Sequence, residues 1–294
     1  MGKKVFIIGS GAVGTSLAAA LHKAGRDIIG IYDIDSRQAR NAAEIVGTRA
    51  FGGALPEIVK TADTVVVTTP DSIIEKIVTL VQAEELYSDN QIWIHCSGHL
   101  TAEVFAPIRS KVKGVATMHP AFVFPPHECT SIPAGVGFAI DGDAKGIKKA
   151  REHVALLKGN AIEVPPDKRA LYHAAMVMAS NYVVAQLSSA RDILLSLGME
   201  EQEIEQLVLT LTQSAIERAH ALGIGHSLSG PVRRGDVSVV GDHISALKDL
   251  PIDRQMYIAA GKATVELAAT QPGYCPDTAQ TLRELFEKAD KVKG

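Results

Sequence analysis

The sequence predicts an α/β fold, in which a doubly wound, mostly parallel sheet is followed by an all-helical carboxyl-terminal domain. Three observations support this prediction. Short apolar, β-branched runs alternate with helical patterns up to the Pro165-Pro166 pair, and repeated units of this kind are typical of parallel sheets. A glycine-rich turn joins the first strand to the first helix. Beyond the doubled proline only long helical patterns follow.

The composition is that of a globular protein with small-molecule partners. The chain has 294 residues, of which 46% are hydrophobic and 21% are charged, and this length is enough for two domains. A formal net charge of −3 gives no reason to expect nucleic acid or an anionic membrane as a partner. Three widely spaced cysteines are typical of reduced thiols, so we expect a cytoplasmic protein. Polar residues interrupt the longest apolar run, residues 174–195, so we expect no membrane span.

The first strand, residues 4–8, leads into Gly9-Ser10-Gly11-Ala12-Val13-Gly14 and then into a helix that begins near Thr15. A buried strand, a tight glycine turn and a helix amino terminus are what the pyrophosphate of a dinucleotide requires. We expect Gly9 to permit the turn, Gly11 to let the backbone approach the phosphates, and Gly14 to let the helix pack on the strand. Ala12 and Val13 would then offer backbone N–H groups.

The second strand, residues 28–32, ends at Asp33, near the position expected for the acid that binds the adenosine ribose. Asp33 should repel a 2′-phosphate and therefore favours NAD. Arg37 keeps NADP possible, because its guanidinium could bind that phosphate, although it could equally be a solvated helix residue. We expect its helix to run to Val46 with Ser36 as the cap.

The remaining elements continue the alternation. We expect a helix over 55–62, a strand over 64–69, a helix over 72–82 and strands over 91–96, 114–119 and 136–140, then helices at about 168–197, 200–222, 252–269 and 276–290. Thr69 ends the strand over 64–69 and Pro70 follows it, and we expect cofactor contacts there. We therefore predict a dinucleotide-binding domain over 1–165 and a helical substrate domain over 166–294, for which the family resemblance described below also implies dimerisation.

Hydride transfer also needs a proton donor or acceptor beside the nicotinamide. Ser97 and His119 lie at strand carboxyl ends. His173 and Asn181 lie on the first helix of the second domain, where a spacing of eight residues puts them within roughly 80° of each other. These four residues are the candidate catalytic group, and Gly98 and Ser180 beside them are candidate substrate contacts.

Each candidate also has a structural alternative. His173 could be a buried core histidine, His119 could shape a turn, and Asn181 could bind helix backbone. Arg233 and Arg234 could clamp a substrate anion or form a salt-bridged loop with Asp236. A zinc site at His119, His127 and Cys129 matches no strong metal signature, so we expect no metal.

These motifs resemble the superfamily of 6-phosphogluconate and β-hydroxyacid dehydrogenases, in which a Rossmann domain precedes a helical domain that commonly dimerises. Within it, the chain is most similar to Rossmann-like proteins whose second half is the domain of unknown function 2520. The resemblance rests on the glycine turn, Ser97-Gly98, His119-Pro120, Ser180-Asn181 and, most specifically, the run Ser-Gly-Pro-Val-Arg-Arg-Gly-Asp over 229–236.

The resemblance implies an NAD(P)-dependent oxidoreductase and a homodimer, but it implies no substrate. The lysine and asparagine pair of better-known β-hydroxyacid dehydrogenases is not present, because Tyr172 stands four residues after Lys168. We therefore expect His173 to replace the lysine as acid and base. A weaker resemblance to prephenate dehydrogenases makes His119 the second candidate.

We predict hydride transfer between nicotinamide and a small polar hydroxy or oxo acid, in a cleft between the two domains. An imine or amino acid substrate is the alternative on the same scaffold, and a deazaflavin-linked reductase is a third. A protein of another class, a non-catalytic NAD(P) sensor, would share the fold.

Overall fold

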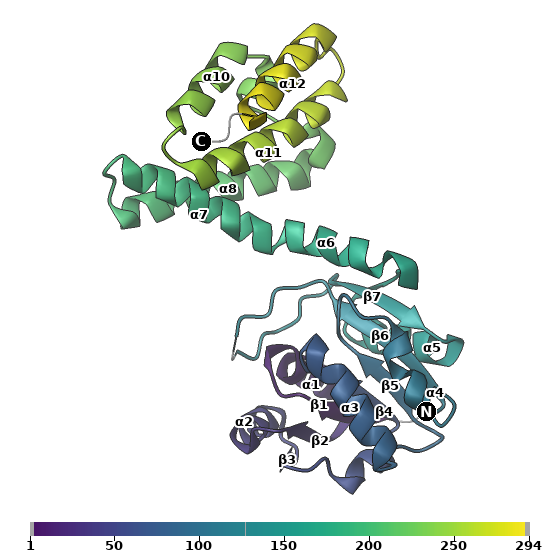
Figure 1. Ribbon diagram of the computed structural model, residues 1–294. Helices are drawn as coiled ribbons and strands as arrows, with labels where there is room; N and C mark the ends of the chain where they lie inside the picture. Colours follow the sequence, from purple (N-terminus) through teal and green to yellow (C-terminus); the bar gives the residue numbers. More distant parts are fainter. Residues whose placement is uncertain (1–2, 127, 292–294) are drawn as a thin grey trace. The chain divides into compact units, whose positions relative to one another are not determined.

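The computed structural model describes residues 3–126 and 128–291. The chain forms two compact units, Met1–Met178 and Ala179–Gly294 (Figure 1). The division falls after the Pro165-Pro166 pair, because the first helix beyond that pair is bonded to the sheet unit: Arg169 donates to the Ser97 carbonyl, and Tyr172 shares a hydrogen bond with His119.

The first unit is a doubly wound, mostly parallel sheet, as predicted (Figure 1). Its strand order is β3-β2-β1-β4-β5-β6-β7-β8, and among the described strands only the β6–β7 pair is antiparallel. The elements are β1 (Lys4–Ile8), α1 (Ala12–Lys23), β2 (Asp27–Asp33), α2 (Ser36–Val46), β3 (Ala50–Gly52), the 3-10 helix η1 (Glu57–Thr61), β4 (Thr64–Val67), α3 (Asp71–Ala83), β5 (Ile92–His95), η2 (Ala102–Phe105), α4 (Ala106–Arg109), β6 (Gly114–Pro120), β7 (Gly137–Gly142), α5 (Ala144–Leu156), β8 (Asn160–Glu163), η3 (Pro166–Lys168) and α6 (Arg169–Ala179).

Apolar side chains cover both faces of this sheet. One face packs on α1, α2 and α5, with Leu17 and Val154 in its core. The other face packs on α3 and η2, with Ile74 and Phe105 in its core. The central strands are therefore continuous apolar runs, as strands buried on both faces require.

Helix α2 begins differently from the prediction. Its N-cap is Asp35, whose carboxylate accepts hydrogen bonds from the backbone N–H groups of Arg37 and Gln38. Ser36 is the first helical residue, so the expectation that it caps the helix was wrong. Both Asp and Ser are favoured as N-cap residues, so the residue types alone do not tell whether Asp35 or Ser36 is the cap. The backbone conformation decides it.

The second unit contains helices alone among its described residues, as predicted. They are α7 (Asn181–Ser196), α8 (Glu201–Leu222), the short η4 (Ile224–His226), α9 (Pro231–Arg234), α10 (Val237–Ala246), α11 (Pro251–Ala269) and α12 (Pro276–Lys291). The helix predicted over 168–197 is in fact two helices. It breaks at Ser180, whose φ of −129° and ψ of −76° are not helical.

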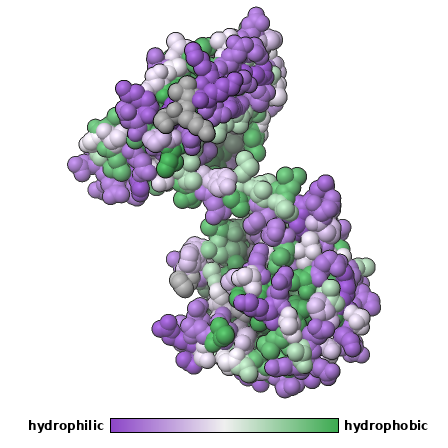
Figure 2. Space-filling model, viewed as in Figure 1, coloured by the Kyte–Doolittle hydropathy of each residue, from purple (hydrophilic) through white to green (hydrophobic). Residues whose placement is uncertain are grey.

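The core of the second unit lies between α10, α11 and α12, around Val240, Ile258 and Phe286. By contrast, in the described chain α7 buries no residue and the long α8 buries only Ile204. Figure 2 shows apolar patches on the visible face of this unit. Throughout the described chain, every helix is too short or too polar to span a bilayer.

Candidate functional site

The glycine turn lies where β1 and β4 end side by side. Gly9 has a φ of +102°, and a Cβ there would lie 2.9 Å from the backbone nitrogen of Thr69. The Thr68 hydroxyl donates to the Gly9 carbonyl at 2.7 Å. A Cβ on Gly14 would overlap that same carbonyl oxygen. Gly9 and Gly14 are therefore needed for the packing of the chain itself.

Gly11 is different, because the surrounding protein does not require a glycine there. A Cβ on Gly11 would meet no atom of the described chain within 4 Å, and its φ of −65° suits any residue. Gly11 is the N-cap of α1, and no side chain of the described residues caps that helix. The first N–H groups of a helix have no partner within it, so the turn presents open backbone donors where an anion binds favourably.

Asp33 holds this turn in place. Its Oδ2 accepts hydrogen bonds from the Ser10 N–H at 2.8 Å and from the Ser10 hydroxyl at 2.9 Å, and its Oδ1 accepts one from the Asp35 N–H. Most of the acceptor capacity of the carboxylate is therefore used inside the protein. The expected role of Asp33 as a ribose ligand now competes with a structural role.

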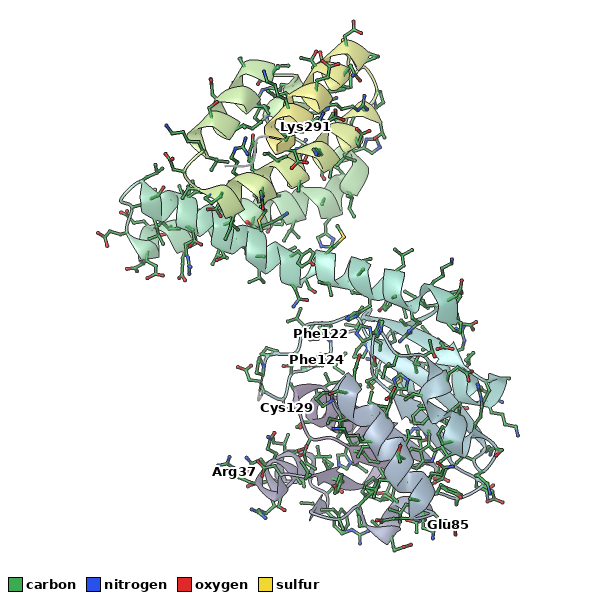
Figure 3. All side chains as sticks on the ribbon, viewed as in Figure 1. Arg37, Glu85, Phe122, Phe124, Cys129 and Lys291 are labelled. Atoms are coloured by element: carbon green, nitrogen blue, oxygen red, sulfur yellow. The ribbon has the colours of Figure 1, made fainter. Side chains whose placement is uncertain are left out.

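A cavity of about 290 Å³ lies against the turn. Its lining includes Gly11, Ala12, Arg37, Asn41 and Cys129, and Figure 3 labels Arg37 and Cys129 on the same side of the sheet unit. Arg37 is exposed, and none of the ion pairs among the described residues includes it. The cavity thus places a guanidinium near the turn.

Thr69 and Pro70 follow β4, as expected from the sequence. The Thr69 hydroxyl is buried and has no hydrogen-bond partner within residues 3–126 and 128–291. Pro70 is the N-cap of α3. An unpaired buried hydroxyl beside the glycine turn fits a polar group supplied from outside the chain.

Ser97 is fully engaged by its neighbours. Its hydroxyl donates to Asp71 Oδ2 at 2.8 Å and accepts from the N–H groups of His99 and Leu100 at 3.1 and 2.9 Å. One donor and two acceptor positions are all that a hydroxyl has. Ser97 therefore shapes the loop after β5 and has no free hydrogen for a substrate.

His119 and His173 come together over Gly98, as the sequence suggested they could. A Cβ on Gly98 would lie 2.9 Å from His119 Nε2 and 2.5 Å from His173 Nδ1. The two rings meet edge to face, with centroids 6.0 Å apart. The other nitrogen of His119, Nδ1, shares a hydrogen bond of 2.9 Å with the Tyr172 hydroxyl. This bond fixes the orientation of the His119 ring.

Two histidines of this region, His119 and His95, are held neutral by burial. Burial lowers the pKa of His119 to about 4, and the nearby Arg169 and His173 also disfavour its protonated form. Burial likewise lowers the pKa of His95 to about 4. His95 accepts from the Ser97 N–H at Nδ1 and faces the Thr101 carbonyl with Nε2, so it is a satisfied core histidine. His119 is the neutral imidazole next to Gly98.

Three members of this group were not singled out from the sequence: Asp71, Arg169 and Tyr172. Arg169 donates from Nη2 to the Ser97 carbonyl at 2.6 Å, and its guanidinium lies 5.7 Å from the centre of the Tyr172 ring. A helical spacing of three and four residues from Arg169 to Tyr172 and His173 puts all three on one face of α6. That spacing was the available signal.

The other predicted residues lie in the second unit. Ser180 and Asn181 stand at the start of α7, where the Ser180 hydroxyl donates to the Asn181 amide oxygen at 3.1 Å. The break at Ser180 invalidates the helical angle expected between His173 and Asn181. Arg234 forms an ion pair with Asp236 at 2.8 Å, and Arg233 lies over the Tyr274 ring at 5.9 Å. Arg234 therefore has an ion-pair partner, as the alternative of a salt-bridged loop required, whereas Arg233 has a ring contact.

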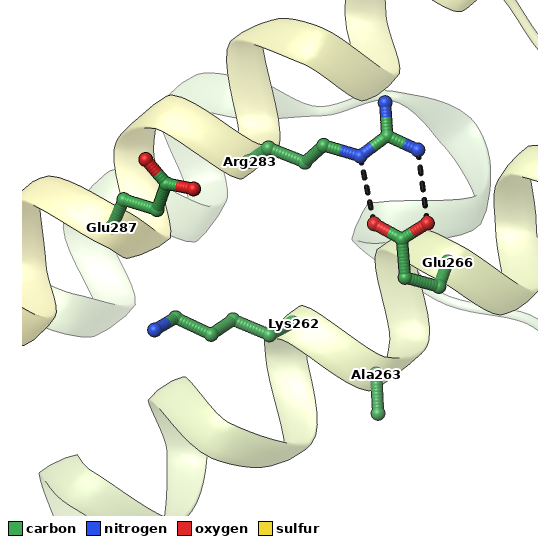
Figure 4. Close-up of a pocket in the computed structure, with 5 residues that line it drawn as sticks. All are labelled: Lys262, Ala263, Glu266, Arg283 and Glu287. Atoms are coloured by element: carbon green, nitrogen blue, oxygen red, sulfur yellow. Dashed lines mark hydrogen bonds and ion pairs between the residues drawn. The ribbon is translucent and has the colours of Figure 1, made fainter.

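No metal-binding group is present in the part of the chain that the structure describes, where no three His, Cys, Asp or Glu residues could hold an ion. His127 lies outside the described residues. A groove of about 270 Å³ between α11 and α12 contains several charges (Figure 4). Arg283 there forms two hydrogen bonds with Glu266, and Lys262 pairs with Asp290. Because these charges neutralise one another, we regard the groove as structural.

Two family models match the chain. Residues 2–120 match a Rossmann-like domain, and residues 136–264 match a domain of unknown function (DUF2520). The chain is a Rossmann-like protein with a DUF2520 domain. This confirms the resemblance found in the sequence. The DUF2520 match begins next to β7, so it covers the last two strands and α6 as well as helices of the second unit.

Solved structures share the fold of this Rossmann-like DUF2520 protein. A candidate NADP oxidoreductase from Bacteroides fragilis is 19% identical, with a TM-score of 0.72, over 90% of this chain and 98% of that chain. A Thermotoga maritima protein of no stated activity is 26% identical, with a TM-score of 0.71 and the same coverage. Pyrroline carboxylate reductase from Plasmodium falciparum, solved with NADP bound, is 12% identical, with a TM-score of 0.58, over 96% and 98%. A search of curated proteins found no match.

Proposed function

We propose that this protein is an NAD(P)-dependent oxidoreductase that transfers a hydride to or from a small polar substrate. The observation that carries the proposal is Gly11, which faces open space at the uncapped amino terminus of α1. Packing explains Gly9 and Gly14 but not Gly11, whereas a pyrophosphate that approaches the backbone explains Gly11. Similarity to the Plasmodium reductase and the Bacteroides candidate oxidoreductase supports the cofactor class.

The residues present fit a dinucleotide. The N–H groups of Ala12 and Val13 would bind the pyrophosphate, and the unpaired Thr69 hydroxyl would meet a polar group of the cofactor. When bound, the nicotinamide ring supplies or accepts the hydride. The protein must then hold the substrate and move one proton.

We propose NADP(H) as the preferred cofactor, which reverses the preference for NAD drawn from Asp33 alone. Both carboxylate oxygens of Asp33 already accept hydrogen bonds from Ser10 and Asp35, so Asp33 is poorly placed to bind the ribose hydroxyls. Arg37 lines the cavity beside the turn, and a guanidinium suits a 2′-phosphate. The NADP-bound Plasmodium structure supports the same choice.

We assign the proton transfer to His119, with His173 beside it to orient the substrate. Tyr172 fixes the Nδ1 side of His119, and this leaves Nε2 next to Gly98 and His173. A neutral imidazole in that position can accept the proton of an alcohol or amine as its hydride leaves for the cofactor, and the imidazolium so formed can protonate a carbonyl oxygen or an imine nitrogen when the reaction runs as a reduction. Ser97 becomes a positioning residue, because its hydroxyl is already used.

A hydroxy or oxo acid is the proposed substrate class, and an imine or amino acid is the alternative. The similarity to pyrroline carboxylate reductase supports the alternative. The neutral His119 disfavours a non-catalytic sensor, because a sensor has no use for an acid and base at this place.

The test begins with cofactor binding. Trp93, the single tryptophan, is buried in the first unit, and its energy transfer to NADPH or NADH measures affinity. We expect Gly11→Val to weaken NADPH binding about tenfold or more, while Gly241→Val, at another open glycine in α10, changes nothing. Arg37→Gln should weaken NADPH but not NADH.

Turnover is then screened with hydroxy acids, oxo acids, imines and amino acids. Absence of binding for both cofactors would refute the proposal. Tight binding without any turnover would favour the sensor.

We also propose that the protein is a homodimer through α7 and α8. A groove of about 320 Å³ between them is lined by Val184, Leu187, Val208 and Leu209, and Leu211 on α8 is 70% exposed. A cluster of exposed apolar side chains of this kind marks a surface that is buried against a partner. A second copy supplies the same apolar surface, as a two-fold interface requires.

A further inference from the structure

Arg169 is a buried cation whose hydrogen-bonding capacity is not met by the protein. Its side chain is 1% exposed. Nη2 donates to the Ser97 carbonyl, but Nε and Nη1 are buried without a hydrogen-bond partner among the described residues. An arginine is always protonated and offers N–H donors on all three nitrogens. Burying such donors unpaired is unfavourable, so their partner must come from elsewhere.

The nearest carboxylates do not supply that partner. Asp141 and Asp71 oppose the lowering of the Arg169 pKa that burial causes, so they lie close enough to act on its charge. Asp141, however, accepts from the Ala102 N–H, and Asp71 accepts from the Ser97 hydroxyl. No ion pair within the described chain includes Arg169. The protein therefore screens this charge but does not pair it.

Arg169 also lies next to the candidate acid and base. Its guanidinium stacks on Tyr172, whose hydroxyl bonds to His119, and its bond to Ser97 holds the residue before Gly98. An anion bound to this guanidinium would therefore lie near the His119–Tyr172 pair. Of the two arginines first considered for this task, Arg234 is paired with Asp236 and Arg233 lies over the Tyr274 ring, and both belong to the second unit, whereas His119 belongs to the first.

We propose that Arg169 binds a carboxylate of the substrate. This inference rests on the proposed function and names the residue that would bind the acid group of its substrate. The guanidinium is closed to solvent in the free protein, so carboxylate binding requires a movement of the Ser97 loop or of the arginine side chain. The substrate carboxylate then completes the hydrogen bonds that the free protein leaves unmade.

The experiment is calorimetric titration with two small carboxylates and their uncharged counterparts: pyruvate against pyruvamide, and oxalate against oxamide. Each is titrated into the full-length protein with and without NADPH. We expect the carboxylates to bind and the amides not to bind. Arg169→Gln should weaken carboxylate binding about tenfold or more, as expected for the loss of a charged hydrogen bond. Arg169→Lys, which keeps the charge, should fall between the two.

Arg151→Gln is the matched control, because Arg151 belongs to the same unit but pairs with Glu163 at the surface; it should bind like the wild type. Trp93 emission reports whether each variant folds. If Arg169→Gln does not fold, NMR spectra of the protein labelled with ¹⁵N-arginine replace it. The Nε signal of Arg169 is the one that is missing from the spectrum of Arg169→Lys. That signal must shift in the wild type when oxalate is added.

The inference is overturned if neither carboxylate binds, if the amides bind equally well, or if Arg169→Gln binds as tightly as the wild type. The outcome is separable from that of the proposed function. NADPH binding without carboxylate binding rejects Arg169 alone, whereas carboxylate binding without affinity for NADPH or NADH rejects the oxidoreductase and leaves the anion site standing.

Discussion

Acidification should destabilise the sheet unit through its buried histidines, and His153 on α5 gives the sharpest test. His153 is 1% exposed, and its two ring nitrogens have no hydrogen-bond partner in the described chain. Burial, with help from Arg26 and Lys149, lowers its pKa from 6.5 to about 3. Between pH 6.5 and pH 3, His153 is protonated in the unfolded chain but not in the folded protein. The free energy of unfolding therefore decreases as the pH falls below 6.5.

The size of the effect follows from the two pKa values. One pKa unit corresponds to about 1.36 kcal/mol, so lowering the pH from 6.5 to 5 removes about 2 kcal/mol through His153. His95, whose side chain is also fully buried and whose pKa is about 4, removes about 2 kcal/mol more over the same range. A combined loss of about 4 kcal/mol is a large part of the stability of an ordinary domain.

The assay is urea unfolding followed by the emission of Trp93, which reports on the first unit alone. His153→Leu removes one titrating group and two unpaired polar atoms. We expect it to be as stable as the wild type or more stable at pH 7, and to lose about 2 kcal/mol less between pH 7 and pH 5. His22→Gln, at an exposed histidine of α1, should keep the full loss. If His153→Leu loses as much stability as the wild type, His153 is not buried as a neutral ring and the reasoning fails.

Two further substitutions test the site and the assembly. Gly98→Ala would place a methyl group 2.5 Å from His173 Nδ1. We expect turnover of the substrate found in the screen to fall about a hundredfold, while the affinity for NADPH stays unchanged. Unchanged turnover would show that Gly98 is not part of the site. In light scattering after gel filtration, the wild type should have twice the chain mass of 31.2 kDa. Leu211→Lys should shift it toward the single chain, whereas Gln206→Lys on the same helix should not; a monomeric wild type would contradict the dimer.

The sequence predicted the central sheet well, because buried parallel strands are long apolar runs that alternate with helices. It missed β3 and β8, which have three and four residues. These segments, Ala50–Gly52 and Asn160–Glu163, contain few β-branched residues. They are strands only because they pair with a neighbouring strand of the sheet. The break at Ser180 was missed for a similar reason, since the helical pattern continues through it.

For the site, the sequence identified the residues whose positions follow from strand ends, and it missed those whose roles depend on burial. His119 follows from the end of β6, and His173 was identified on an apolar helix. Arg169 looks like an ordinary surface arginine in the sequence, because only the folded chain shows that its side chain is covered. The structure places Ser97 in the same region, but the hydrogen bond from its hydroxyl to Asp71 could not be foreseen.

The bonds between Asp33 and Ser10 have a consequence for the thermodynamics of cofactor capture. A glycine-rich loop that was loose in the free protein would lose conformational freedom on binding, at about 1–2 kcal/mol for each residue that becomes ordered. Here the Ser10 backbone and hydroxyl are already held by one carboxylate oxygen. The ordering is done during folding, so the interaction energy of the pyrophosphate can appear as affinity.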